Sequence, residues 1–287
     1  MHADRHTSRG VYTSFGCLLI TKLMREITAS ESRKIMINIL KDVTEFCDKH
    51  SITYFLSSGT LIGAIRHKGF IPWDDDIDID MPRPDYEKFI QLYKKDGKYE
   101  ICEPSDKNSF YFYVKVYDNS TIKIEKGIDY KRFYPLGIDV DVFPIDGQPA
   151  GTEFELFKKQ TDRRKKYFEY FSCCICDTKN KKLKSLLKIF ACRLLGKNYF
   201  RNRYNNSAKQ YDYNSSTMVG FNSPYSKYSN RHRKEVYQER VKVQFEDGQY
   251  WAPAGYDEYL SNIYGDYMKL PPIEQQKTHH INNIFWK

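Results

Sequence analysis

The chain has 287 residues, which is enough for one large domain or two small ones with a buried core. Its 40% hydrophobic content is typical of a globular protein, and its seven cysteines, an odd number, argue against a disulfide framework. The formal net charge of +9 favours anionic partners, such as nucleotides, phosphorylated glycans, nucleic acid or an anionic membrane face.

Residues 1–23 fit the rest of the chain poorly. A short apolar run from Val11 to Ile20 follows Arg5 and Arg9 and faintly resembles a signal peptide, but polar residues interrupt it and it is too short to span a membrane. We expect residues 1–23 to be an extension, either disordered or produced by a misassigned start codon, with Met24 as the better beginning.

The first predicted helix begins at a capping box formed by Thr28 and Glu31. Apolar residues then recur at helical spacing, which predicts one face that packs on a sheet. The run from Ile52 to Leu56 predicts the first strand. The apolar face comprises Met36, Ile39, Leu40, Val43, Phe46 and Cys47.

Gly59 and Thr60 follow this strand and precede a predicted helix from Leu61 to His67. A glycine turn at a helix N-terminus offers free backbone N–H groups and the positive end of the helix dipole to a phosphate. Gly59 and Thr60 are therefore candidate substrate-binding residues. Arg66, at the end of the same helix, is a further candidate for a nucleotide phosphate, although a cation there is also what the helix dipole favours.

Acids at positions 74, 76, 78 and 80 alternate with other residues, including Ile77 and Ile79. On a strand this alternation places all four carboxylates on one face. Four like charges repel unless protons or cations match them, and such hard oxygen ligands suit Mg²⁺ or Mn²⁺. A solvated charged edge strand and a Ca²⁺-binding acidic loop are the alternatives. Asp74 and Asp80 lie toward the strand ends, where supporting or solvent-facing positions are expected, and Asp74 is grouped with the substrate-binding candidates.

Two later segments add to this site. The run from Tyr111 to Tyr117 predicts a strand on which Lys115 shares a face with tyrosines, so Lys115 is a candidate phosphate ligand or an ordinary exposed lysine. The β-branched run that contains Asp139 and Asp141 predicts another strand with both acids on one face. Asp141 is the expected third carboxylate beside Asp76 and Asp78, with Asp139 in reserve.

The segment from Phe154 to about Arg203 is basic, helical in pattern and short of Gly and Pro. A stripe of apolar residues flanked by lysines predicts a helix that either packs on the protein or lies on an anionic bilayer surface. The Cys173–Cys176 cluster has no second pair of ligands at the spacing that structural zinc needs. The apolar stripe comprises Leu183, Leu186, Leu187, Phe190 and Leu194.

The motifs together resemble the LicD family, relatives of fukutin and fukutin-related protein, over roughly residues 24–280. They are Gly59–His67, Ile71–Asp78 and Asp141–Pro144. The resemblance implies an α+β nucleotidyltransferase fold of polymerase-beta type, a mixed sheet flanked by helices. Residues 24–150 would form the catalytic core, and residues 151–287 would form a basic, helical and loop-rich subdomain that completes it.

The resemblance also implies an activity. A phospho-alcohol, phosphocholine or an alditol phosphate, would pass from a CDP-linked donor such as CDP-choline or CDP-ribitol to a hydroxyl of a cell-surface glycan, such as lipopolysaccharide or teichoic acid, releasing CMP. Asp76, Asp78 and Asp141 would be the catalytic residues and would hold Mg²⁺ or Mn²⁺ across the donor phosphates. Such a donor would be cytosolic, so a cytoplasmic enzyme is expected, in peripheral contact with the inner membrane face.

Two other functions are compatible with parts of the sequence. A D-x-D glycosyltransferase that uses a nucleotide sugar would explain the acids but not the Gly59-Thr60 turn. A basic nucleic-acid-binding protein would explain the charge, but no recognised binding motif is present and 46 Lys+Arg against 37 Asp+Glu is a moderate excess. Nucleic acid is therefore not expected as a partner.

Overall fold

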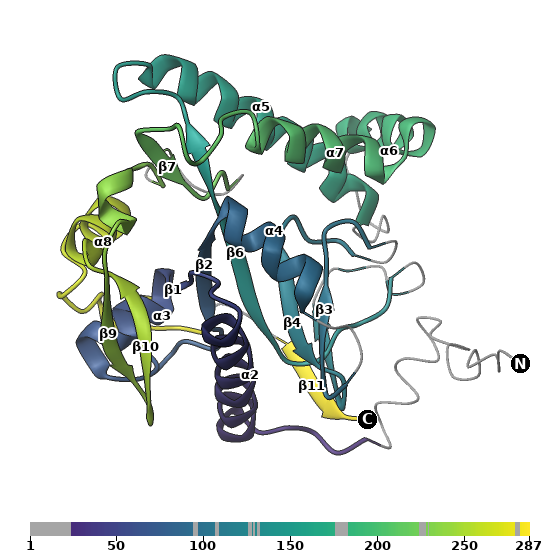
Figure 1. Ribbon diagram of the computed structural model, residues 1–287. Helices are drawn as coiled ribbons and strands as arrows, with labels where there is room; N and C mark the ends of the chain where they lie inside the picture. Colours follow the sequence, from purple (N-terminus) through teal and green to yellow (C-terminus); the bar gives the residue numbers. More distant parts are fainter. Residues whose placement is uncertain are drawn as a thin grey trace, which may run out of the picture.

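The computed structural model describes residues 24–93, 97–106, 109–125, 128, 130, 133–175, 183–223, 228, 230–278 and 282–287. The expected extension, residues 1–23, lies outside this range. The described chain is an α+β fold in which helices flank a mixed sheet and a further layer of helices lies at one end (Figure 1). This confirms the expected mixed sheet with helices on it.

The central sheet has the strand order β1-β2-β6-β4-β3, and β2 and β6 are its parallel pair. Their register sets Asp78 opposite Asp141, and the antiparallel β4–β6 register sets Lys115 opposite Asp141. Two acids and a lysine therefore lie side by side across three neighbouring strands. The strands are β1 (Phe55–Leu56), β2 (Asp78–Pro82), β3 (Tyr99–Cys102), β4 (Val114–Asp118) and β6 (Asp139–Gln148), with β7 (Met218–Gly220) paired to β6 and β8 (His232–Arg233) paired to β7.

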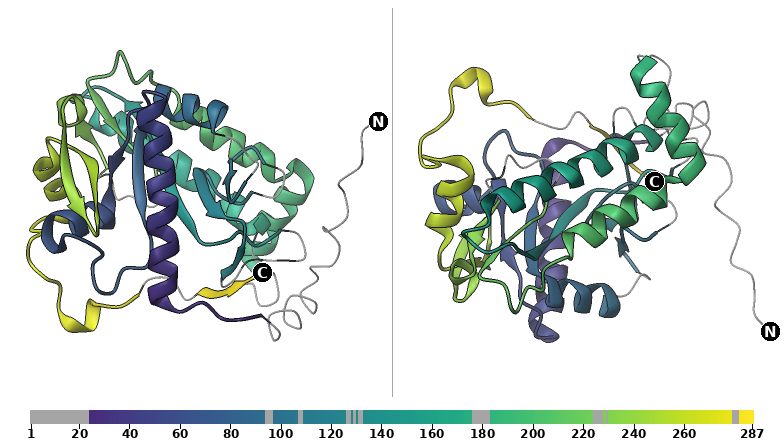
Figure 2. Two further views of the ribbon diagram at one scale, coloured as in Figure 1. Left: turned by 60° about the horizontal axis from the view of Figure 1, so that its bottom comes forward. Right: turned by 90° about the horizontal axis from the view of Figure 1, so that it is seen from above.

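Helix α2 (Ala29–Lys49) runs along one face of this sheet, with α4 (Arg83–Leu92) on the same core (Figure 2, left). The predicted capping box is confirmed: Glu31 N–H donates to Thr28 Oγ1 at 3.2 Å, and Thr28 N–H donates to Glu31 Oε2 at 2.9 Å. The apolar face predicted from the sequence is buried apart from Phe46, which is partly buried. Burial of this face against the sheet stabilises the helix.

Three helices form the layer at the carboxyl end of β6: α5 (Phe154–Ile175), α6 (Leu183–Leu195) and α7 (Lys197–Ala208) (Figures 1 and 2). They confirm the helical character expected for this segment. An aromatic cluster built around Phe112, Phe171 and Tyr204 holds the layer to the rest of the fold. The side chains of Leu183, Leu186 and Leu187 lie outside the described part of the structure, as does Cys176.

The C-terminal part of the chain packs against the segment that contains Ser58 and Phe70. A hairpin packs Phe245 against Phe70 with ring centroids 5.0 Å apart, and the Tyr259 hydroxyl accepts a hydrogen bond from Ser58 N–H at 3.2 Å. The expected division at residue 150 stays a prediction. The remaining elements are the β9 (Arg240–Phe245) and β10 (Gly248–Pro253) hairpin, β11 (Asn282–Trp286) paired to β5 (Thr121–Glu125), helix α8 (Tyr256–Tyr264), and the short turns η2 (Lys234–Tyr237) and η3 (Ile273–Gln275).

Several local expectations differ from the structure. Only Asp78 and Asp80 of the four alternating acids lie on a strand; residues 74–77 form a loop because Arg33 Nη2 donates to the carbonyls of Pro72 and Asp74 at 2.8 and 2.9 Å. Asp80 is buried, not solvent-facing. The other differences are that β4 begins at Val114, β1 has two residues, and helix α3 (Ser58–Ile62) begins before Leu61 and continues as a π-helical turn, η1 (Gly63–His67).

Among the helices that the structure describes, none combines the length and the apolar character needed to cross a bilayer.

Candidate active site

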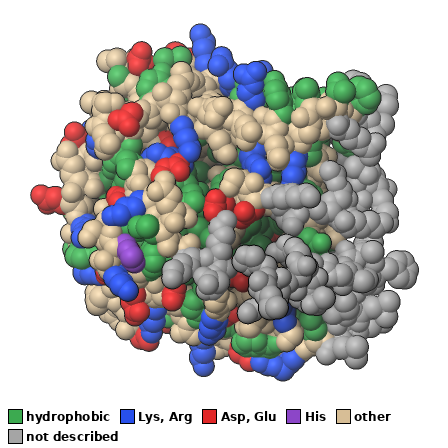
Figure 3. All heavy atoms as spheres, turned by 45° about the vertical axis from the view of Figure 1, so that its right-hand side comes forward, with side chains coloured by type: hydrophobic (Ala, Val, Ile, Leu, Met, Phe, Trp, Pro, Cys, Tyr) green, Lys and Arg blue, Asp and Glu red, His purple; other side chains and the backbone are tan. Residues whose placement is uncertain are grey.

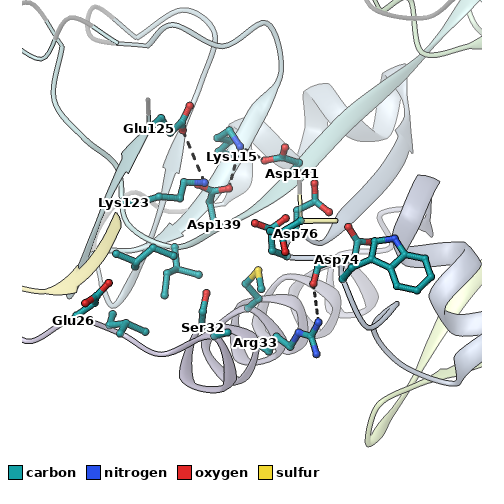
Figure 4. A pocket seen from close by; sticks show the side chains of 18 of the residues that line it. Glu26, Ser32, Arg33, Asp74, Asp76, Lys115, Lys123, Glu125, Asp139 and Asp141 are labelled. Carbon is teal, nitrogen blue, oxygen red and sulfur yellow. Dashed lines mark hydrogen bonds and ion pairs between the residues drawn. The ribbon is translucent and has the colours of Figure 1, made fainter. Parts of the chain in front are cut away.

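A cavity of about 340 Å³ lies beside the strands β4, β5 and β6, where the start of α2 and the loop before β2 meet (Figure 4). It brings together five of the residues that the sequence indicated, although they are spread over more than 60 positions of the chain. These are Asp74, Asp76, Lys115, Asp139 and Asp141.

Asp78 is held at the edge of this group by its backbone. Its N–H donates to Thr60 Oγ1 at 2.9 Å, and its carbonyl accepts from Ser57 N–H at 3.1 Å. On the other side Asp141 N–H donates to the carbonyl of Ile77 at 2.9 Å. Thr60 therefore positions an acid, and the β2–β6 ladder presents Asp78 and Asp141 to the same site.

The carboxylates of this site disfavour one another's charge. Burial, followed by repulsion from Asp76, Asp141 and Asp74, raises the pKa of Asp78 well above its ordinary value. Burial and the neighbouring Asp76 raise the pKa of Asp74 to about 8. Burial also raises the pKa of Asp141 to about 6, although Lys115 opposes that shift. Carboxylates this close together need bound protons or cations to offset their repulsion in the folded protein.

Lys115 supplies one cation, and it is a buried lysine rather than an exposed one, with 6% of its side chain accessible. Its Nζ donates to Asp139 Oδ1 at 3.0 Å and also to Asp141 Oδ1. Lys123 pairs with the other oxygen of Asp139. Burial alone would raise the pKa of Asp139, but these two lysines outweigh it and hold that pKa at about 2.

The two candidates for the third carboxylate thus differ. Both oxygens of Asp139 are engaged by lysines, whereas Lys115 engages one oxygen of Asp141. Asp141 also lies opposite Asp78 in the β2–β6 register. Asp141 is the carboxylate better placed to act together with Asp78.

Gly59, Thr60, Arg66 and Asp78 do not line the cavity, although Asp78 lies opposite its wall residue Asp141 in the sheet. A Cβ built on Gly59 would stand 2.6 Å from Asp74 Oδ2, so the absence of a side chain lets this carboxylate approach helix α3. Arg66 turns away and donates through one terminal nitrogen to the carbonyls of Tyr267 and Lys269, at 2.5 and 3.3 Å.

Two basic residues of the site were not indicated by the sequence analysis. Arg33 lines the cavity and ties the acidic loop to α2, and Lys123 enters from β5. Arg33 sits on an ordinary charged helix face, and Lys123 alternates with apolar residues on a strand. At neither position does the sequence distinguish the residue from an ordinary solvent-exposed lysine or arginine.

The donor set suits a hard divalent cation. In the described part of the chain, no three Asp, Glu, His or Cys side chains are already gathered as a metal cluster. The residues present are nevertheless carboxylates, the ligands that Mg²⁺ and Mn²⁺ prefer, and burial together with their mutual repulsion raises the pKa values of Asp74 and Asp78. A cation placed among them would relieve that repulsion.

This electrostatic arrangement predicts the pH dependence of stability. The pKa of Asp74 is 3.8 when unperturbed and about 8 when folded, so between these values the folded protein binds more protons than the unfolded chain. Its free energy of unfolding must therefore fall as pH rises through this window. We expect the melting temperature in chelator to fall from pH 5 to pH 8, and the fall to be smaller in Asp74→Asn. A melting temperature that rises over the same range would contradict the raised pKa values.

A family model described as "LicD/FKTN/FKRP, nucleotidyltransferase domain" matches residues 51–175, which contain all the acids discussed above. The lipopolysaccharide cholinephosphotransferase LicD of Haemophilus influenzae is 33% identical over 275 residues, covering 91% of this chain and 99% of the relative. Two uncharacterized proteins match shorter segments: one of Rickettsia typhi is 46% identical over 54 residues, covering 19% of this chain and 18% of its own length, and one of Rickettsia prowazekii is 36% identical over 75 residues, covering 23% and 28%. Because the similarity to the Haemophilus protein runs through nearly the whole of both chains, this chain belongs to the LicD family.

Proposed function

We propose that this protein is a metal-dependent phosphotransferase that moves phosphocholine or an alditol phosphate from a CDP-linked donor to a hydroxyl of a cell-surface glycan. The observation that carries the proposal is the meeting of acids from the loop before β2 and from β6 with a buried lysine in one cavity, in a relative of a lipopolysaccharide cholinephosphotransferase. The β1-β2-β6 part of the sheet would be the nucleotidyltransferase-like core.

Asp76, Asp78 and Asp141 would hold Mg²⁺ or Mn²⁺. When bound, the metal neutralises charge on the donor phosphates and so assists departure of CMP. Asp139 would stand outside this set because two lysines engage its oxygens. Asp74 lies against Gly59 at the other side of the cavity and would face the donor.

Lys115 and Lys123 would bind the transferred phosphoryl group. Both are cations at the cavity wall, and Lys115 is fixed between Asp139 and Asp141. In the reaction the acceptor hydroxyl attacks the phosphorus of the phospho-alcohol and gives its proton to a carboxylate of the site, the P–O bond to CMP breaks, and CMP leaves with the electron pair. The lysines would stabilise the charge on the phosphoryl oxygens during this exchange.

The acceptor would be presented near a membrane, on the cytoplasmic side where the donor is made. In helix α6, Ile189 and Cys192 are buried, while Phe190 and Leu194 are 66% and 74% exposed. Along the upper edge of the face drawn in Figure 3, where α5, α6 and α7 lie, hydrophobic and basic side chains adjoin one another. An apolar face beside cations suits peripheral contact with anionic lipid.

Thermal stability measured with candidate ligands tests the proposal. A ligand that binds only the native state raises the free energy of unfolding by mass action, by about 2.7 kcal/mol when its concentration is a hundred times Kd. The melting temperature rises as a result. We expect stabilisation by CDP-choline or CDP-ribitol in Mg²⁺ or Mn²⁺, and its loss in chelator. CTP, UDP-glucose and a short RNA serve as comparisons. Stabilisation by UDP-glucose alone would indicate a glycosyltransferase, and a response to RNA without metal would indicate a nucleic-acid-binding protein.

A further inference from the structure

Three aromatic side chains lead away from the acidic cavity, and we refer to Tyr113, Phe143 and Phe221 as the aromatic strip. The ring centroids of Tyr113 and Phe143 are 4.4 Å apart, and those of Phe143 and Phe221 are 4.6 Å apart. Each of the three residues is only partly buried, unlike Phe112 and Phe171 in the nearby core. The strip therefore combines close ring packing with access to solvent.

The backbone connects this strip to the reacting groups. Tyr113 directly precedes β4 and lines the acidic cavity. Phe143 follows Asp141 by two residues on β6, so both side chains emerge on the same face of the strand. Phe221 follows β7, which pairs with the carboxyl end of β6. The strip thus begins at the acids and runs along β6 toward its far end.

A second cavity, of about 170 Å³, lies at the far end of the strip, and Phe221 forms part of its wall. Polar groups from several separate segments line it, and they offer both hydrogen-bond donors and acceptors. These groups include Glu103, Ser105, Asn205 and Lys209. Of the strip, Phe221 lines this cavity, and partly exposed aromatic rings beside a polar recess suit a ligand with both apolar and hydroxylated sides.

We propose that the aromatic strip is the binding site for the acceptor glycan. A pyranose ring has a face of C–H groups and a periphery of hydroxyls, so its face would pack on Phe143 and Phe221 while its hydroxyls reach the second cavity. The next sugar, over Tyr113, then places a hydroxyl at the Asp141 side of the acidic cavity. This assignment rests on the proposed function, because it supplies the nucleophile for that reaction.

Substitutions at Phe221 test the assignment. Phe221→Leu keeps apolar bulk but removes the flat ring, whereas Phe221→Tyr keeps the ring. With deacylated lipopolysaccharide as the acceptor probe, we expect Phe221→Leu to raise the KM for this acceptor about tenfold and to leave the KM for CDP-choline unchanged. The KM of Phe221→Tyr for the same acceptor should remain close to that of the unchanged protein. Phe154→Ala is the matched control, since Phe154 is an exposed aromatic residue that lines neither cavity.

Binding is also measured without turnover, by saturation-transfer NMR from the protein's aromatic protons to the sugar protons of the same probe. This measurement tests the two proposals separately. If the unchanged protein binds the oligosaccharide through Phe221 but transfers nothing from CDP-choline or CDP-ribitol, the proposed activity is wrong and the glycan site stands. Equal binding and equal KM in Phe221→Leu would overturn the glycan site. So would binding of intact lipopolysaccharide but not the deacylated form, because the strip would then contact acyl chains. Thermal unfolding of each variant confirms that it is folded.

Discussion

Asp78→Asn is expected to lower the rate of phosphotransfer by about 10³-fold or more while leaving the metal-free protein at least as stable as before. The side chain lies opposite Asp141 in the sheet, and burial together with repulsion from four other acids raises its pKa well above the ordinary value. A neutral amide of nearly the same shape removes that repulsion but also removes a carboxylate from the proposed metal site. Activity and stability should therefore change in opposite directions.

The measurement pairs turnover with thermal unfolding in chelator and in Mg²⁺. Asp247→Asn is the matched control, because that carboxylate is 68% exposed in the β9–β10 turn and lines neither cavity. The unchanged protein and the control should both gain stability with Mg²⁺ and CDP-choline, and Asp78→Asn should not. Retained turnover in Asp78→Asn would refute the role assigned to this acid. A clear loss of stability in chelator would contradict the repulsion from which the prediction follows.

Lys115→Met is expected to destabilise the metal-free protein by about 3–5 kcal/mol. The ammonium group is buried and interacts with both Asp139 and Asp141, so removing it leaves two buried carboxylates with less compensation. Methionine has a similar length and fits beside Tyr111, whose ring lies 4.7 Å from the lysine nitrogen. The loss should therefore come from charge and not from an empty space.

Urea unfolding in chelator measures this loss. Lys98→Met provides the matched control: its side chain is 62% exposed and its nitrogen lies 4.0 Å from Asp118, so its loss should cost less than about 1 kcal/mol. Mg²⁺ should restore part of the stability of Lys115→Met by replacing the missing cation. A loss at Lys115 as small as the loss at Lys98 would show that the buried ion pairs do not hold β4 and β6 together.

The local features of this fold followed from short-range patterns. The capping box at Thr28 and Glu31 predicted where α2 begins, and the 3.6-residue repeat of apolar side chains predicted which face it buries. The clustering of acids near residues 74–80 and at Asp139 and Asp141 indicated a cation-binding site. These features depend on neighbours within one turn or one strand, so the sequence contains them directly.

Strand limits were harder to predict because they depend on which residues pair with a neighbouring strand. Residues 111–113 have the composition of a strand, but the β4–β6 ladder covers only Val114 to Tyr117. The alternation of acids suggested a strand from residue 74, yet Arg33 holds the carbonyls of the loop before Asp78. In both places a contact distant in sequence outweighed local pattern.

By itself, then, the sequence determined the acidic motifs, the capped helix and the family resemblance. Only the tertiary structure decided which acids share a site and which cations neutralise them. The register of β2, β6 and β4 places Asp78, Asp141 and Lys115 in one row, and Lys123 arrives from β5 to engage Asp139. The same folding turns Arg66 to the carbonyls of Tyr267 and Lys269. Charges in a low-dielectric interior interact through space, so their roles depend on strand register and not on spacing along the chain.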